Sequence, residues 1–361
     1  MGAFTLGSLR HPIIQAPMAG GPSTPALAAA VSGAGGLGFL AAGYKTVDAV
    51  RSELGELRAL LTEAQPFGVN VFAPTVSNAD PEAVAAYARM LRGEADRLGV
   101  TLGEPRWDDD HYGEKLDLLC AAGVPVVSFV FGCPPHADLR RLHESGVSVW
   151  VTVTTADEAG LALAAGADAL VVQGIEAGGH RGGFDDERPG DIGLLALLQL
   201  VRRAVGDEPA LVAAGGIATG QAVAAVLAAG ADAAQLGTAF MLCPEAATAP
   251  VHHEVLAHGA ASTALTRAFT GRTARGVINR FLQEHSSDAP IGYPEVHHLT
   301  APLRVAARQH GDSAGVHLWA GQAYTLAESL PAAELVHLLS EAAHVALTQA
   351  LTRLGGAASD A

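Results

Sequence analysis

A glycine-rich loop that carries a single histidine is the stretch of this sequence best suited to chemistry. The loop covers residues 173–183, which read QGIEAGGHRGG, and it follows an apolar run at 168–172 that is typical of a buried strand. Glycine permits positive φ and lets the backbone approach a flat ligand closely. Histidine is the side chain best suited to moving a proton near neutral pH. This pairing indicates a cofactor enzyme with His180 as acid or base, and a structural loop with a surface histidine is the alternative.

The composition describes a packed globular protein and disfavours some classes of partner. Of the 361 residues, 49% are apolar and 16% are charged, so a sizeable core can be buried. The formal net charge of −15 disfavours the broad positive surface that nucleic acids and anionic membranes require. We therefore expect a small-molecule ligand, and an anionic one would have to be held by local groups.

Cysteine usage and the N-terminus predict a cytoplasmic protein without a membrane segment or a metal centre. The three cysteines, Cys120, Cys133 and Cys243, are odd in number, widely spaced and free of any CxxC pattern, which favours reduced thiols. The first ten residues lack a basic region followed by an apolar run, so we expect no secretory signal. The uncharged stretch 209–231 is long enough to span a bilayer, but its glycines favour a buried βαβ unit.

Short apolar runs alternate with longer alanine-rich amphipathic runs, which is the pattern of repeated βα units around a parallel sheet. Thr24, Asp80 and Thr155 are typical helix N-caps, and glycines at 123, 146, 166 and 230 are typical helix ends. Eight strands are predicted, at 13–16, 37–40, 68–71, 126–129, 148–152, 169–172, 211–214 and 233–236. We predict an α/β fold, a (β/α)8 TIM barrel with a smaller helical insertion domain, and an open doubly wound sheet is the alternative.

Three segments follow from this pattern. Residues 1–245 are expected to form the ligand-binding barrel. Residues 246–325 break the alternation with helix-like runs and two His-His pairs, so they are expected to form a helical module that covers the substrate. Residues 326–361 are expected to form a C-terminal helix that returns to the barrel.

The residues directly after the strands of a parallel barrel share one face, where functional groups gather. After the first strand, Pro17, Met18 and Ala19 form a short-chained turn that could lie against a ring system. Asn70 ends the third strand, where a buried amide needs partners. Two further turns are suited to holding phosphate through backbone N–H groups, and they contain Gly215 and Gly216, and Gln235, Leu236, Gly237 and Thr238.

Together these motifs resemble the nitronate monooxygenase family of class I type, formerly called 2-nitropropane dioxygenases, which are FMN-dependent (β/α)8 enzymes. The resemblance covers most of the chain, from PIIQAPMAGG at 12–21 and GVNVF at 68–72 to WAGQ at 319–322. It implies that FMN is bound by Asn70, Gln173, Gly178, Gly179, Gly215 and Gly216, with Gln235 to Thr238 around its phosphate and Pro17 to Ala19 near its rings. It also implies that His180 is the catalytic base.

The resemblance implies oxidation of alkyl nitronates, such as propionate 3-nitronate, or of nitroalkanes, with O2. Two alternatives stay open. The same barrel and an equivalent histidine loop occur in FMN-dependent NAD(P)H reductases of the enoyl-acyl carrier protein or quinone type, and a barrel without activity could serve as a flavin-binding scaffold. The apolar composition also leaves room for a homodimer.

Overall fold

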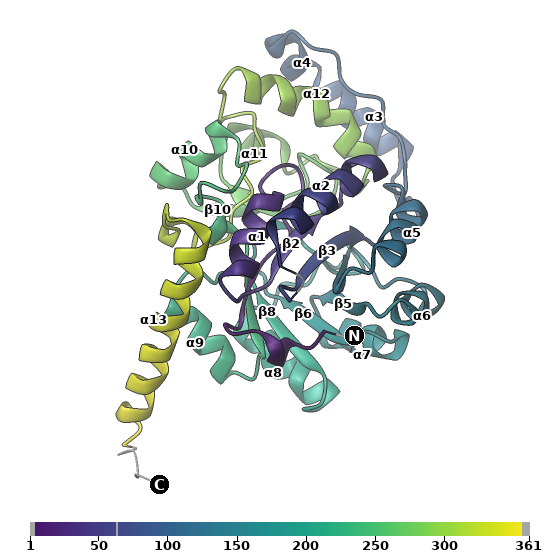
Figure 1. Cartoon of the computed structure of the whole chain (residues 1–361). Helices are drawn as coiled ribbons and strands as arrows, with labels where there is room; N and C mark the ends of the chain where they lie inside the picture. The colour runs from purple at the N-terminus through teal and green to yellow at the C-terminus, as the bar shows by residue number, and fades with distance from the viewer. Residues whose placement is uncertain (1–3, 63, 356–361) are drawn as a thin grey trace.

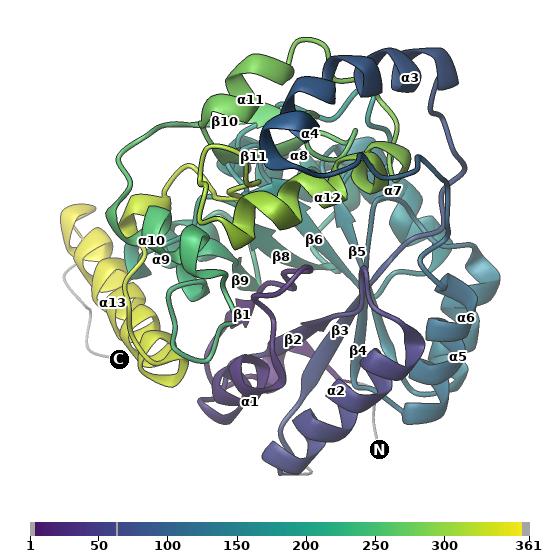
Figure 2. The ribbon, with the colours of Figure 1, turned by 90° about the horizontal axis from the view of Figure 1, so that it is seen from above.

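Eight parallel strands close into a barrel at the centre of the molecule (Figure 2). The computed structural model describes residues 4–62 and 64–355. The strand order is β1-β9-β8-β6-β5-β4-β3-β2, and a parallel bridge between Ile14 and Leu37 closes the ring. The barrel strands are β1 (Ile13–Gln15), β2 (Gly38–Ala41), β3 (Phe67–Phe72), β4 (Val126–Val130), β5 (Ser148–Val153), β6 (Ala169–Gln173), β8 (Ala210–Ala214) and β9 (Ala233–Leu236). The predicted strands and the predicted TIM barrel are therefore confirmed.

One helix follows each barrel strand and packs on the outside of the ring (Figure 1). These helices are α1 (Pro25–Gly33), α2 (Val47–Leu60), α5 (Tyr112–Ala122), α6 (His136–Glu144), α7 (Ala156–Ala165), α8 (Leu194–Val205), α9 (Gly220–Ala228) and α13 (Ala332–Arg353). The last of them, α13, lies against α9 and α1 and buries Leu335, Val336 and Leu339 in the same apolar cluster. None of the helices in the described ranges combines the length and the hydropathy that a membrane crossing requires.

Local sequence signals explain where the barrel helices begin and end. Thr24 and Thr155 each accept a hydrogen bond from the backbone N–H three residues later, as N-caps do. Gly166 and Gly230 adopt φ values of 107° and 96° at two helix ends. An Ala-Asp pair follows each of these two glycines, and its aspartate has the same role at both places. Asp168 and Asp232 each accept a backbone N–H from the start of the neighbouring strand at 2.7 Å.

A second layer covers the mouth of the barrel (Figure 2). It contains α10 (Pro250–His258), α11 (Arg280–His285) and α12 (Glu295–Gln309), together with α3 (Pro81–Met90) and α4 (Arg92–Leu98) from the β3–α5 connection. These helices share one apolar cluster that includes Tyr87, Phe269 and Leu299. We call this layer the cap.

The cap also contains a three-stranded antiparallel sheet, which differs from the purely helical module predicted for this part of the chain. Its strands are β10 (Thr263–Thr266), β11 (Ala274–Val277) and β7 (Gly179–His180), with β11 in the middle. Strands of four residues or fewer, with small and polar side chains, carry little periodic signal. The sheet joins the histidine loop of the barrel directly to the cap.

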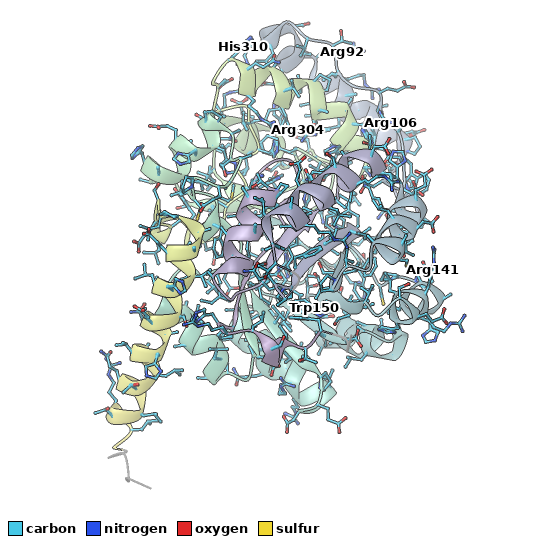
Figure 3. All side chains as sticks on the ribbon, in the orientation of Figure 1. Arg92, Arg106, Arg141, Trp150, Arg304 and His310 are labelled. Carbon is cyan, nitrogen blue, oxygen red and sulfur yellow. The ribbon has the colours of Figure 1, made fainter. Side chains whose placement is uncertain are left out.

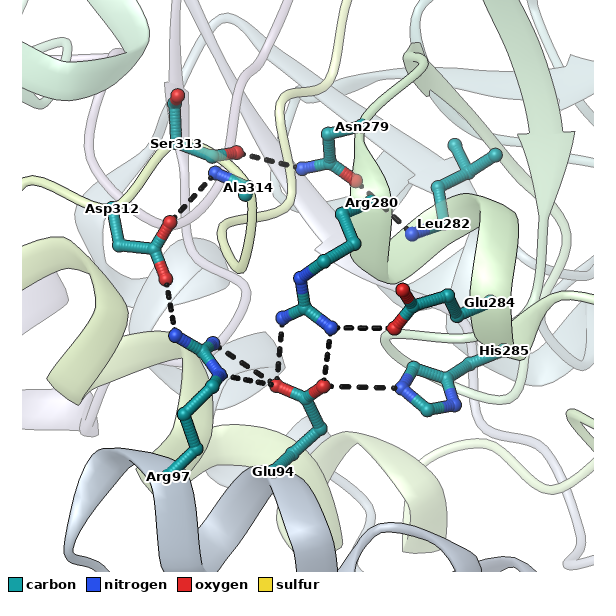
Figure 4. A network of polar contacts seen from close by, with 10 residues as sticks. All are labelled: Glu94, Arg97, Asn279, Arg280, Leu282, Glu284, His285, Asp312, Ser313 and Ala314. Carbon is teal, nitrogen blue, oxygen red and sulfur yellow. Dashed lines mark hydrogen bonds and ion pairs between the residues drawn. The ribbon is translucent and has the colours of Figure 1, made fainter.

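A polar network fastens α4 to α11 within the cap (Figure 4). Glu94 accepts hydrogen bonds from Arg280 Nη2 at 2.8 Å and from Arg97 Nη2 at 3.0 Å. Arg97 also donates to Asp312 at 2.9 Å. Hydrogen bonds from Arg280, and then those from Arg97, lower the pKa of Glu94 to about 2 despite its burial.

Replacing Glu94 by Gln should lower the free energy of unfolding by about 1 to 3 kcal/mol at pH 7, because it removes the buried carboxylate that pairs with both Arg97 and Arg280. The effect is limited because both guanidinium groups are partly exposed to solvent. The pKa of Glu94 is lower in the folded state than in the unfolded state, so its contribution is present above about pH 4.5 and is lost as the pH falls toward 2. Urea unfolding of both proteins at pH 7 and pH 3 measures the effect. If the difference in unfolding free energy between the two proteins is as large at pH 3 as at pH 7, the prediction is wrong.

Candidate active site

A cavity of about 380 Å³ lies between the carboxyl ends of the barrel strands and the cap. This is the usual place and a usual size for a ligand site in a TIM barrel. The cavity brings together nearly all of the residues predicted from the sequence: Pro17, Met18, Ala19, Asn70, Gln173, Gly178, Gly179, His180, Gly215, Gly216, Gln235, Gly237 and Thr238. Leu236 is the predicted residue that does not line it, because its side chain points into the apolar cluster between the barrel and its helices.

His180 lies in an aromatic pocket at the top of the cavity. Its ring is 5.6 Å from that of Phe131, 5.4 Å from that of Trp319 and 5.8 Å from that of Tyr293, measured between centroids. The accessible part of the imidazole faces the cavity. Burial, together with the nearby charges of Arg272 and Arg304, lowers the pKa of His180 to about 3. The imidazole is therefore neutral at physiological pH.

Thr270 holds the imidazole of His180 in place. The Thr270 Oγ1 lies 2.9 Å from His180 Nε2 and 3.2 Å from the carbonyl oxygen of Arg272. The hydroxyl can donate to the carbonyl and accept from Nε2–H, or donate to Nε2 itself, so this contact orients the ring in either tautomer.

The loop that carries His180 is fixed by its own side chains. Gln173 Nε2 donates to the carbonyl oxygen of His180 at 3.1 Å, and Gln173 Oε1 accepts from the Gly182 N–H at 2.8 Å. Arg181 is fully buried and donates to the carbonyl oxygens of Gly174 and Pro189. The side chain of Gln173 thus organises the loop as well as lining the cavity.

Basic side chains from the cap complete the cavity, and they were missing from the predicted set. Arg304 and Arg308 line it from α12, one helical turn apart, and so does His297 from the same helix. His252 lines it from α10, and His317 from the segment after α12. Figure 3 shows Arg304 at the level where α12 overlies the barrel. Among the residues that line the cavity in the described ranges there is no Asp or Glu. A protein with a formal charge of −15 therefore presents a cationic lining to its ligand.

Burial keeps these imidazoles uncharged. The pKa of His252 falls to about 4, and burial with the charges of Arg304 and its neighbours lowers the pKa of His297 and His317 well below the ordinary value. Burial also lowers the pKa of Arg304 to about 10, so this guanidinium remains charged at neutral pH. Arg304 donates to the carbonyl oxygen of His297 at 2.7 Å and to Thr300 Oγ1 at 3.1 Å. The permanent charges that line the cavity are therefore those of the two arginines.

Comparison with known proteins agrees with this arrangement. The sequence matches the family model described as nitronate monooxygenase over residues 5–342. It is 44% identical over 343 residues to a nitronate monooxygenase of Pseudomonas aeruginosa, across 92% of this chain and 96% of that protein. It also resembles a solved nitroalkane oxidase structure from Streptomyces ansochromogenes, with a TM-score of 0.91 and 51% identity over 96% of this chain and 99% of the other. The chain belongs to the nitronate monooxygenase family.

As a member of the nitronate monooxygenase family, the protein is a flavin-dependent oxidoreductase, and the cavity fits a flavin. Gly215 and Gly216 turn away from β8 with φ values of 116° and 69°, which exposes backbone rather than side chains to the cavity. A Cβ atom at Gly179 would have no neighbour within 4 Å, so this part of the loop is also open. The predicted phosphate turn after β9 leads into a short 3-10 helix, η2 (Thr238–Phe240).

The turn after β1 and the amide of Asn70 are both fixed in place. Gln15 and Met18 are tied to Ser23, because Gln15 Nε2 and the Met18 N–H both donate to its hydroxyl. Asn70 Nδ2 donates to Ser128 Oγ at 3.0 Å and to the Ser128 carbonyl at 3.1 Å, which leaves the side-chain oxygen Oδ1 of Asn70 available to a ligand.

The segment at 319–322 has a packing role in this nitronate monooxygenase fold. The Gly321 N–H donates to Thr238 Oγ1 at 3.1 Å, and the Gln322 N–H donates to the Glu176 carbonyl at 3.0 Å. A Cβ atom at Gly178 would lie 2.5 Å from the Gly321 nitrogen, so only glycine permits this approach. The segment therefore locks the cap onto both the histidine loop and the turn after β9.

A sequence signal for the missed basic residues does exist. His297, Arg304 and Arg308 are spaced by seven and four residues, which places them on one face of a helix. The face of an amphipathic helix that packs inward is normally apolar. Basic residues aligned on such a face therefore indicate a ligand site. Adjacent residues on a helix point in different directions, so the two members of a His-His pair do not share one site. His252 and His297 line the cavity, whereas His298 pairs with Asp108 at 2.7 Å.

Proposed function

We propose that the protein oxidises alkyl nitronates and their parent nitroalkanes, with FMN as the bound flavin and O2 as the oxidant. The observation that carries this proposal is a neutral imidazole, His180, in a cavity whose charged lining is cationic. A nitronate is an anion and is attracted by Arg304 and Arg308. A neutral nitroalkane must first lose a proton from the carbon that bears the nitro group, and a neutral imidazole can accept it.

In this proposal Asn70, Gln173, Gly178, Gly179, Gly215, Gly216, Gln235, Gly237 and Thr238 hold FMN, and Pro17, Met18 and Ala19 lie along its rings. When bound, FMN supplies the electron acceptor for the substrate and passes the electrons on to O2. The imidazole of His180 takes the proton of a nitroalkane, and Arg304 compensates the negative charge that forms on the nitro oxygens. The aromatic side chains around His180 keep bulk water out of the reacting region.

Anaerobic mixing of the purified enzyme with ethylnitronate tests the proposal. Loss of the flavin absorbance near 450 nm without any pyridine nucleotide, and its recovery on admission of air, is the expected result. Bleaching by NADPH together with no response to nitronate would instead support a reductase. Protein that is colourless and does not take up FMN would support neither activity.

The turn at Gly237 offers a test of cofactor placement that leaves the fold intact. Gly237 has an ordinary φ of −104°, and an added Cβ would lie 3.6 Å from Ala16 Cβ and 3.8 Å from Met18 Sδ, which are normal contacts. Gly237→Ala should therefore change the free energy of unfolding by no more than about 0.5 kcal/mol. If the FMN phosphate lies at this turn, the methyl group should weaken FMN binding by about tenfold, a loss of about 1.4 kcal/mol.

Fluorescence titration of the apoprotein with FMN measures this effect. Gly55→Ala, at an exposed helical glycine with nothing within 4 Å of the added Cβ, is the matched control. Unchanged FMN affinity in the Gly237 variant would remove this turn from the proposed phosphate site.

A further inference from the structure

A second cavity of about 430 Å³ lies beside the first. The two cavities share Tyr44, Phe72, Phe131 and His297, so these side chains form a wall with a cavity on each side. The second cavity is lined on its far side by charged and polar groups of the 106–111 connection and by His298. Nothing in the proposed flavin site or in the proton transfer uses this space.

Beside the proposed base, the wall is formed by Phe131, which lines both cavities. Phe131 and Tyr293 both lie against His180, with ring centroids 5.6 Å and 5.8 Å from that of the imidazole, and their own centroids are 5.4 Å apart. Tyr293, which lines the second cavity, donates its hydroxyl to the Tyr44 hydroxyl at 3.1 Å. Tyr44 also stacks on His297 with ring centroids 4.4 Å apart. The reacting region and the second cavity are therefore separated by the side chains of this wall.

Backbone strain is concentrated around the second cavity. In the described part of the chain, the non-glycine residues with positive φ are Tyr44, Asp110, His111 and Phe131, and all of them line this cavity. Such conformations cost about 1 to 3 kcal/mol each and persist where the surrounding structure enforces them, typically at functional sites. At Tyr44 this conformation is held by an adjacent ion pair. Asp110 accepts the Tyr44 N–H at 2.9 Å and pairs with the fully buried Lys115 at 2.7 Å.

We propose that the second cavity is a subsite for the alkyl chain of the substrate, and that Tyr44, Phe131 and Tyr293 form an openable partition that sets the accepted chain length. This inference rests on the proposed function. With the reacting carbon at His180 and the flavin on the barrel side, the alkyl chain must lead away from the flavin. The aromatic wall offers that chain apolar contact, and the charged groups beyond it lie next to solvent. Asp110 and Lys115 then act as positioning residues for Tyr44.

Two variants with opposite expected effects test the subsite. Thr75→Trp fills the second cavity from a position that does not line the first. Tyr44→Phe removes the hydroxyl that closes the partition and keeps the ring. The matched control is Val76→Trp, at a neighbouring exposed residue that lines neither cavity. The substrates are butyl-1-nitronate and octyl-1-nitronate.

For the wild type we expect kcat/KM to rise about two- to fourfold per added methylene once the chain enters the second cavity. Thr75→Trp should lower kcat/KM for the octyl substrate at least about tenfold and leave the butyl substrate unchanged, whereas Tyr44→Phe should raise the value for the octyl substrate alone. Equal effects on both chain lengths in both variants would overturn the subsite.

Binding of carboxylates, which resemble nitronates in shape and charge but do not react, gives a measurement that does not depend on turnover. Calorimetric titration of the holoenzyme should show octanoate binding more tightly than butanoate, and Thr75→Trp should abolish this difference. If no nitronate is oxidised but the octanoate preference is lost in Thr75→Trp, the proposed function fails while the cavity assignment stands. If nitronates are oxidised and octanoate gains nothing over butanoate, the subsite fails alone. Arg106→Trp fills the cavity from an exposed side chain and replaces Thr75→Trp if that variant does not fold.

Discussion

His180→Asn should lower kcat/KM for neutral nitroalkanes by about 10²- to 10⁴-fold and leave FMN bound. Asparagine can keep a hydrogen bond to Thr270 but cannot accept a proton from carbon. Because the pKa of His180 is about 3, the wild-type base is already unprotonated across the neutral range, and its loss should be felt at every pH there. Steady-state kinetics with nitroethane, together with the flavin-to-protein absorbance ratio, measure both parts of this prediction.

The comparison between nitroethane and ethylnitronate makes the test specific for proton transfer. The nitronate has already lost its proton, so the His180→Asn enzyme should retain most of its activity on the anion. Equal losses on both substrates would show that His180 orients the substrate and does not act as a base. Full activity on nitroethane would remove His180 from the mechanism.

Arg304→Met should raise the KM for ethylnitronate about 10- to 100-fold, because hydrogen bonds to a charged group contribute about 1.5 to 3 kcal/mol. Arg304 is nearly buried and no carboxylate lines the cavity in the described ranges, so its charge is directed at the ligand space. Neutral nitroethane should show a much smaller change in KM. Initial rates with the two substrates measure this difference.

The same variant has a second consequence that a purely structural role would not produce. Arg304 is one of the charges that lower the pKa of His180, so its removal should raise that pKa toward the ordinary value. The acid limb of kcat/KM for nitroethane should then move to higher pH, because more of the imidazole is protonated at any given acidic pH. Arg203→Met, at an exposed arginine of α8, is the charge control and should leave both the KM and the pH profile unchanged. If the acid limb of the pH profile does not move in Arg304→Met, Arg304 does not influence the pKa of His180.

The barrel could be predicted from the sequence because its signals are local. Each strand is a short apolar run, and Thr24, Thr155, Gly166 and Gly230 mark helix ends through contacts within a few residues. The turns after the strands could be placed for the same reason, since parallel strands put their carboxyl ends on one face. Leu236 is the exception within those turns, because alternation along a strand sends neighbouring side chains to opposite faces.

The cap could not be predicted in the same way because it is assembled from distant segments. Helices α3 and α4 come from the β3–α5 connection, yet they pack against α12, more than 190 residues later in the chain. The strand β7 lies in the histidine loop but pairs with β11 of the cap. No local pattern encodes these contacts.

The sequence by itself determined the barrel, the histidine loop and the glycine turns, because strand alternation, helix caps and positive-φ glycines are properties of neighbouring residues. Only the tertiary structure decided the electrostatics of the site. It placed Arg304 in the same cavity as His180 without a carboxylate in the lining to neutralise it, and it buried the imidazole deeply enough to keep it uncharged. Charge and burial depend on which distant groups share a cavity, and chain folding alone brings such groups together.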